Sequence, residues 1–355
     1  MLAKATLQSA QGHRLTEAMM RQDFYPHPCA KVERYETMTS RLFFAGEFVY
    51  KVKKPVRFTF VDATTPVKRF QLCQNEVLLN ARLAPEIYVG VRVIVERLGG
   101  YTLVPEAKAT LQNVREFAVV MRRLPSDRML DHMVAGGGID VGDIQELAKR
   151  LAAFHAHSSI AKSRVWGSAQ AISRLVTNNL AETEQLAADS VTRDKLAAVG
   201  KYLRRYISSH WQTLDNRARD GYVRDGHGDL RCDGVCLSPA GLAIINCVEY
   251  SEKLRYGDVA SEVASLALDL ERAQRSDLAD ELARAYVAET DDTGLLELLR
   301  FYKCHRSIFR GKLELLLSLQ NEILIERRIL ARSNASGFFA LAESHVTASR
   351  PGLLL

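Results

Sequence analysis

A short polar loop, His227-Gly228-Asp229-Leu230-Arg231, follows a predicted strand in the second half of the chain. A carboxylate in such a loop can orient a hydroxyl group and accept its proton while a phosphoryl group is transferred. The alternative is structural, because an aspartate in a polar turn can accept hydrogen bonds from backbone N–H groups. The loop is therefore a candidate catalytic site, with Asp229 as the candidate base.

A second candidate is Lys51, which lies with Lys53 on one face of a predicted strand. A lysine held on a strand can bind nucleotide phosphates, and a carboxylate on a neighbouring helix can position it. Glu76 lies in the first helix after this strand and is the expected partner. We prefer Lys51 to Lys53 because it lies deeper in the apolar run. The alternative is an ordinary basic edge strand in contact with solvent.

A third candidate is Glu249, which follows the short apolar run Ile244–Val248. An acidic side chain at this place could reach a metal ion. The alternative for Glu249 is a structural salt bridge, for example to Arg255. Asp258, a few residues later, is expected to cap the following helix.

Other polar features favour structural roles. Scattered cysteines without a second close pair indicate apolar packing better than a zinc site, and histidines are common at helix ends. These residues are Cys232, Cys236, Cys247, His155 and His157. The basic helix expected over Phe301–Arg332 indicates a solvated face, with a surface for an anionic substrate as the alternative. The acidic loop of Glu289, Asp291 and Asp292 could meet ammonium groups but is first of all a loop.

The elements that must position these residues fall into two sets. The first is a hairpin over residues 38–60 around Ala45-Gly46-Glu47, a helix over 65–84, and strands over 88–96, 101–104 and 116–121. The second set is mainly helical, with helices expected over about 142–157, 170–188, 193–218, 256–290 and 294–333. Leu130–Asp140, with three successive glycines, is the expected linker. This order indicates an α+β amino-terminal part followed by a helical part.

The composition sets limits on the class of protein. The 355 residues are 47% hydrophobic and 25% charged, which excludes a disordered chain. The net charge of +6 permits a small anionic ligand and does not indicate a nucleic-acid binder. The six dispersed cysteines, the absence of an apolar leader and the short apolar runs predict a cytoplasmic protein without a membrane span.

The motifs resemble a known family. HGDLRxxxV followed by IINCVEY is similar to the HGDLxxxN…IDxxE core of aminoglycoside phosphotransferase-like proteins, which have the protein-kinase-like fold. Three segments resemble one bacterial subgroup: YPHP at residues 25–28, and the segments 36–55 and 75–91. In that subgroup a P-loop ATPase domain often follows. The resemblance covers about residues 22–335. No P-loop motif occurs in the chain, so we expect the module to be standalone.

The resemblance implies a two-lobed, protein-kinase-like α+β fold. A small β-rich N-lobe would span residues 22–125, a large helical C-lobe residues 126–335, and a tail residues 336–355. It also implies that ATP or GTP binds in the cleft between the lobes.

The family's site residues can be carried over one at a time. Lys51 corresponds to the phosphate-binding lysine and Glu76 to its helix partner. Met121, Arg122 and Leu124, with Arg123, correspond to the hinge that meets the adenine. Asp229 corresponds to the catalytic aspartate, preceded by His227 of the motif.

Two departures fall on the metal site. The family's metal-binding aspartate is Asn246 here, and the asparagine five residues after the catalytic aspartate is Gly234. Asp233 or Glu249 could compensate, and we expect a weakened Mg²⁺ site. Two hypotheses stay open: a phosphotransferase with an unknown small-molecule or protein acceptor, and a pseudokinase-like module that binds a nucleotide or a partner.

Overall fold

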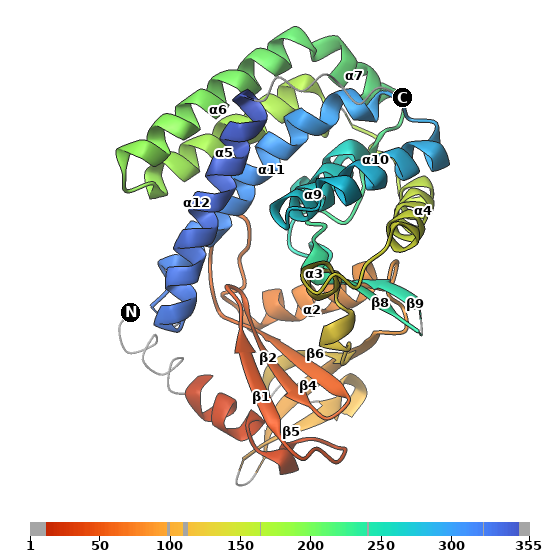
Figure 1. Ribbon diagram of the computed structural model, residues 1–355. Coiled ribbons are helices and arrows are strands. Elements are labelled where there is room, and N and C mark those ends of the chain that lie inside the picture. The colour runs from red at the N-terminus through yellow and green to blue at the C-terminus, as the bar shows by residue number, and fades with distance from the viewer. Residues whose placement is uncertain are drawn as a thin grey trace. The chain divides into compact units, whose positions relative to one another are not determined.

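The computed structural model describes residues 12–97, 100–108, 113–163, 165–239, 241–321 and 323–347. The chain forms two compact units (Figure 1). The first comprises Met1–Pro125 and Ala243–Ser251, and the second comprises Ser126–Leu242 and Glu252–Leu355. The sequence division assigned residues 243–251 to the C-lobe, whereas this segment packs with the first unit.

The first unit is built on a six-stranded antiparallel sheet. Its strand order is β1-β2-β3-β6-β4-β5. The strands are β1 (Val32–Glu36), β2 (Ser40–Ala45), β3 (Phe48–Lys53), β4 (Tyr88–Arg97), β5 (Gly100–Pro105) and β6 (Val114–Arg122). The predicted hairpin is β2–β3, and Gly46 makes its turn at φ +57°, a conformation that glycine adopts without steric cost. β1 was not predicted.

Alternation along β3 places its side chains in two different cores. Tyr50 and Val52 pack with Phe43 on one face of the sheet. Val49 packs on the other face with Cys73 of α2 (Pro66–Asn80). Thr65 caps α2 by accepting a hydrogen bond from the backbone of Lys68. The helix therefore covers the face from which Lys51 and Lys53 project.

The second unit is mainly helical. Its helices are α3 (Leu130–Ala135), α4 (Val141–His157), α5 (Ala169–Leu186), α6 (Ser190–Ser209), α7 (Trp211–Arg219), α8 (Glu252–Arg255), α9 (Val259–Arg272), α10 (Ser276–Thr290), α11 (Leu295–Ser318) and α12 (Ile325–Thr347). The short strands β7 (Val223–Asp225) and β10 (Tyr256–Asp258) pair with each other. β8 (Val235–Ser238) and β9 (Gly241–Ile244) follow the polar loop. α12 runs alongside α11 (Figure 1).

Several helix predictions were too long. The expected helix 193–218 is divided into α6 and α7, 256–290 into α9 and α10, and 294–333 into α11 and α12. The expected linker Leu130–Asp140 contains α3, and α12 extends to Thr347 through the residues expected as a tail from 336. Residues 348–355 of that tail lie outside the described residues. None of the described helices is both long and apolar enough to cross a bilayer.

Candidate functional site

Two lysines of β3 converge on one buried carboxylate of α2. Lys51 Nζ lies 2.6 Å from Glu76 Oε1, and Lys53 Nζ lies 2.5 Å from Glu76 Oε2. Burial alone would raise the pKa of Glu76, but the two ammonium groups outweigh it and lower that pKa to about 2. Glu76 is therefore an anion at neutral pH and anchors both lysines.

The two lysines differ in accessibility. The Lys51 side chain is 12% exposed and contacts Glu76, whereas the Lys53 side chain is 2% exposed and also pairs with Glu249. The expectation that Lys51 lies deeper was wrong. The alternative of a solvated edge strand is also wrong, since β3 lies between β2 and β6. Lys51 is the lysine of this pair that a ligand can reach.

The predicted hinge lies at the end of β6. Met121 and Leu124 pack in one apolar cluster, which also contains Ile245 from the second segment of the first unit. Arg122 is exposed, and its backbone N–H donates to the Ile87 carbonyl, 2.8 Å away. The hinge residues thus combine an apolar surface with a backbone held in an extended conformation.

The segment that carries Asn246 is fixed by its neighbours. Asn246 is exposed and has φ 70°, a left-handed conformation that asparagine tolerates better than most residues. The next residue, Cys247, donates its backbone N–H to Asn80 Oδ1 at 2.9 Å. Glu249 is bound to Lys53. The structural alternative for Glu249, a salt bridge, is therefore present, but its partner is Lys53 and not Arg255, which pairs with Asp225.

The residues expected at the metal site are two carboxylates that each pair with a basic side chain, and one neutral amide. Glu249 pairs with Lys53, Asp233 pairs with Arg231 at 2.6 Å, and Asn246 is neutral. Within the part of the chain that is described, no three His, Cys, Asp or Glu side chains gather to hold a metal ion. Mg²⁺ needs anionic oxygens in near-octahedral geometry, so these residues do not fit it well.

The polar loop follows β7. His227 is buried, and Asp229 is half-buried. The Oδ1 atom of Asp229 is shielded from solvent and has no hydrogen-bond partner among the described residues. A turn-capping aspartate would accept backbone N–H groups. The geometry of Asp229 therefore does not support the structural alternative.

Two residues that sequence reasoning missed hold this loop through the two backbone groups of one residue, Gly228. Glu262 Oε1, from α9, accepts the backbone N–H of Gly228 at 2.5 Å. Arg306 Nη1, from α11, donates to the Gly228 carbonyl at 2.7 Å. Because Gly228 immediately precedes Asp229, these contacts fix the direction in which the carboxylate projects.

Glu262 is itself part of a buried polar network. Its Oε2 lies 2.9 Å from His155 Nε2, and His155 Nδ1 lies 2.8 Å from the Tyr286 hydroxyl. Burial would raise the pKa of Glu262, but the hydrogen bond and charge of His155, with His227 and the Gly228 N–H, lower it to about 2. His155 thus has a structural role beneath the loop.

The basic residues of the expected 301–332 helix do not form a solvated face. Four of them lie in α11 and bind groups of the second unit. Lys303 pairs with Glu271, Arg306 binds Gly228, Arg310 pairs with Asp269, and Lys312 pairs with Glu182. These four side chains therefore bind within the second unit instead of facing solvent.

One acid of the loop suggested for ammonium groups, Asp292, is not available to a ligand. Asp292 is buried and accepts two hydrogen bonds from Arg217, at 2.7 and 2.8 Å. Arg217 also pairs with Asp258, which caps α9 as predicted by accepting the Ala260 N–H. These acids hold the helices together.

Sequence comparison finds relatives without an assigned function. The chain is 32% identical over 282 residues to uncharacterised proteins of Mycobacterium tuberculosis and Mycobacterium bovis. The match covers 79% of this chain and 54% of each relative. The chain therefore spans about half the length of the curated relatives it matches. No family model matches the chain.

Comparison with solved structures finds small-molecule kinases. A choline/ethanolamine kinase family protein from Mesorhizobium loti superposes with a TM-score of 0.56 at 14% identity, covering 94% of this chain and 95% of that one. Amicoumacin kinase, in complex with AMP-PNP and Ca²⁺, superposes with 0.55 at 9% identity, covering 96% of each chain. A thermostable mutant of an aminoglycoside phosphotransferase superposes with 0.51 at 11% identity, covering 88% and 95%.

The chain has the protein-kinase-like fold. The α+β class with a β-rich first part and a large helical second part, predicted from the HGDLR and INCVEY motifs, is confirmed. At 9 to 14% identity the similarity is one of fold. Within this fold, the lysine pair lies in the first unit and the Asp229 loop in the second.

Proposed function

We propose that the chain is a phosphotransferase that moves the terminal phosphoryl group of ATP or GTP to a hydroxyl of an acceptor, with Asp229 as the base. The observation that carries the proposal is the Asp229 carboxylate. Its Oδ1 has no hydrogen-bond partner in the described chain, although the preceding peptide is held by Glu262 and Arg306. A buried polar atom left without a partner requires an explanation, and a role in proton transfer provides one.

Each set of residues has its own task in this reaction. Lys51 binds phosphate oxygens of the nucleotide. Met121 and Leu124 offer an apolar surface to the adenine or guanine ring. The nucleotide supplies the phosphoryl group. The acceptor oxygen forms a bond to the γ-phosphorus as the bond to the β–γ bridging oxygen breaks, and the hydroxyl proton passes to Asp229. His227, buried before Asp229, supports the loop.

A second function is favoured by the residues at the expected metal site. Asn246 carries no charge, and Lys53 and Arg231 already occupy the carboxylates of Glu249 and Asp233. A chain with so few free anionic oxygens could bind a nucleotide with little help from Mg²⁺ and transfer its phosphate slowly or not at all. The alternative is therefore a pseudokinase-like module that binds a nucleotide or a partner.

Thermal unfolding with ATP and GTP, each with and without Mg²⁺, tests nucleotide binding. A ligand selective for the folded state raises Tm. We expect the rise in wild type and in Asp229→Asn, and its loss in Lys51→Ala. Lys68→Ala is the matched control, because Lys68 lies on exposed α2 surface and pairs with Asp62. No rise with millimolar nucleotide in wild type would contradict both candidate functions.

Nucleotide turnover with a panel of hydroxyl acceptors separates the two candidates. If the chain is a transferase, Asp229→Asn lowers turnover by ~10²-fold or more. Wild type that binds nucleotide without turnover of any acceptor would favour the pseudokinase-like module. Equal turnover in wild type and Asp229→Asn would refute the role of Asp229 as base.

A further inference from the structure

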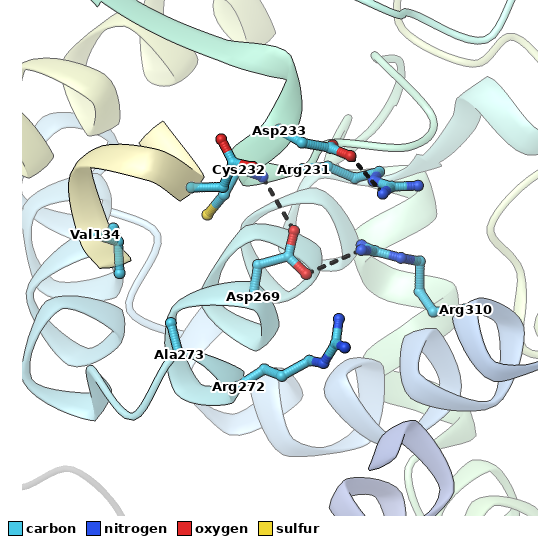
Figure 2. Close-up of a pocket in the computed structure, with 9 residues that line it drawn as sticks. Val134, Arg231, Cys232, Asp233, Asp269, Arg272, Ala273 and Arg310 are labelled. Carbon is cyan, nitrogen blue, oxygen red and sulfur yellow. Dashed lines mark hydrogen bonds and ion pairs between the residues drawn. The ribbon is translucent and has the colours of Figure 1, made fainter. Parts of the chain in front are cut away.

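A pocket of about 320 Å³ opens in the second unit beside the Asp229 loop (Figure 2). Arg231 and Asp233 line it, and they follow Asp229 by two and four residues. The other walls come from α3, the end of α9 and the middle of α11. The volume lies at the lower end of the range for small-molecule sites. The pocket is thus of a size for a small ligand, and part of its wall is the segment that directly follows the candidate base.

The wall contains three guanidinium groups, and Figure 2 shows them gathered around Asp269. Two of them are paired with carboxylates. Arg231 Nη2 lies 2.6 Å from Asp233 Oδ2, and Arg310 Nη2 lies 3.0 Å from Asp269 Oδ1. The second oxygen of Asp269 accepts the Cys232 N–H at 3.0 Å. Both oxygens of Asp269 therefore already accept a hydrogen bond within the second unit.

The third guanidinium, Arg272, has no carboxylate partner among the described residues. Its Nη2 donates to the Asn334 amide oxygen at 2.5 Å, and its carbon lies 4.4 Å from the centre of the Phe338 ring. Arg272 is exposed at the pocket. The remaining acid of the wall is Asp131, whose nearest basic side chain in the described chain is His132 at 4.0 Å.

The two arginines that pair with carboxylates each still have a nitrogen atom without a hydrogen-bond acceptor. Arg310 Nη1 and Arg231 Nε are buried and have no hydrogen-bond partner in the described chain. Burial alone would lower the pKa of Arg231, but Asp233, Asp229 and Asp269 raise it above its ordinary value. Arg231 is therefore charged, and the wall has more donors than its own acceptors satisfy.

We propose that this pocket binds the anionic group, phosphate or carboxylate, of a small acceptor whose hydroxyl is presented to Asp229. The proposal rests on the proposed function and names its substrate class. The planar fork of a guanidinium matches both anions, and Arg272 offers one that no carboxylate of the described chain neutralises. A polycationic acceptor would meet the guanidinium of Arg272, which no carboxylate of the described chain neutralises, and is disfavoured. Asp131 can accept a hydrogen bond from another hydroxyl of the same acceptor.

Calorimetric titration with inorganic phosphate at low ionic strength tests the pocket. We expect binding to wild type and a weakening of ~10-fold or more in Arg272→Gln, the range for a charge-assisted hydrogen bond. Arg275→Gln is the matched control, because Arg275 pairs with Asp277 and does not line the pocket. Lys51→Ala should leave phosphate affinity unchanged, which separates this pocket from the nucleotide phosphate site.

Three results would overturn the proposal. In the first, wild type binds phosphate no more strongly than chloride at equal ionic strength. In the second, wild type and Arg272→Gln bind phosphate with equal affinity. In the third, Arg272→Gln and Arg275→Gln weaken phosphate binding equally. The nucleotide-induced rise in Tm is measured in the same variants. If nucleotide does not raise the Tm of wild type, the proposed function is contradicted. The phosphate titration still tests separately whether the pocket binds an anion.

Turnover provides the link between pocket and reaction. A phosphorylated acceptor should have a lower KM than its neutral parent alcohol, and Arg272→Gln should raise that KM with little change in kcat. Equal KM values for the two acceptors in wild type would refute the assignment of the acceptor's anionic group to this pocket.

Discussion

Replacing Glu262 by glutamine tests how the Asp229 loop is held. The amide is nearly isosteric and keeps an oxygen for the Gly228 N–H, so the substitution removes charge and little volume. Glu262 is buried and contacts His155 and Gly228, with His227 and Arg306 in its electrostatic surroundings. The negative charge is therefore the property that the variant isolates.

The magnitude follows from the pKa of Glu262. A fall from 4.5 to about 2 corresponds to about 3 kcal/mol, at about 1.4 kcal/mol for each pKa unit. Because the folded-state pKa lies below the unfolded value, this stability is present above pH 4.5 and is lost as the pH falls toward 2. We expect Glu262→Gln to lower the free energy of unfolding by about 3 kcal/mol at pH 7. The difference from wild type should narrow below pH 4.5.

Urea unfolding at several pH values measures this difference, and turnover is measured on the same samples. Glu271→Gln is the matched control. Glu271 is also buried and does not contact the Asp229 loop. Burial would raise its pKa, but His345 and Lys303 outweigh this effect and lower the pKa to about 2. Both variants should lose similar stability. We expect lower turnover only in Glu262→Gln, because Gly228 is then held less firmly before Asp229.

Two results would refute the reasoning. Wild-type stability of Glu262→Gln at pH 7 would show that the charge contributes little. Loss of stability with unchanged turnover, or equal loss of turnover in Glu271→Gln, would show that Glu262 does not position the loop.

Three further predictions test the first unit and the loop. Lys53→Ala should lower the free energy of unfolding by about 3–5 kcal/mol, because it leaves buried carboxylates uncompensated. Lys51→Ala should lower it by less, and equal losses in urea unfolding would contradict this. Asn246→Asp keeps a residue that tolerates φ 70° and adds a charge, so calorimetry should detect stronger Mg²⁺-dependent ATP binding; no change would mean that another residue completes the site. Gly226→Ala places a Cβ 2.5 Å from Glu262 Oε1 and should reduce turnover, because Glu262 must then move. Full activity would show that the Glu262 carboxylate can shift without disturbing the Asp229 loop.

The sheet and α2 could be predicted because their signals are local. Alternating side chains identify β3, and Thr65 with the following proline marks the start of α2. The ends of α9 and α11 could not be predicted in this way. Residues 273–275 and 319–324 contain neither glycine nor proline, so no local signal marks the breaks. After the end of α9, Gln274 has a left-handed φ of 62°, a conformation that glutamine does not favour and that its residue type does not announce.

The site was predictable to the same degree. The pairing of Lys51 with Glu76, 25 residues apart, follows from a strand and the next helix. The contacts of Gly228 with Glu262 and Arg306 join residues 34 and 78 positions apart, and nothing near either residue indicates them. The burial of Lys53 depends on Glu249, 196 residues later. Alternation predicts the face of a strand and not how far a side chain on that face is buried.

The segment Ala243–Ser251 has a consequence for the synthesis of the chain. It belongs to the first unit, yet 117 residues of the second unit precede it. While the ribosome is still adding those residues, the buried Lys53 has no Glu249 to pair with, and Asn80 has no Cys247 N–H to accept. The amino-terminal unit therefore cannot reach its final state first and wait for the second. A fragment that stops at Pro125 would lack both contacts, and the two units are expected to mature together.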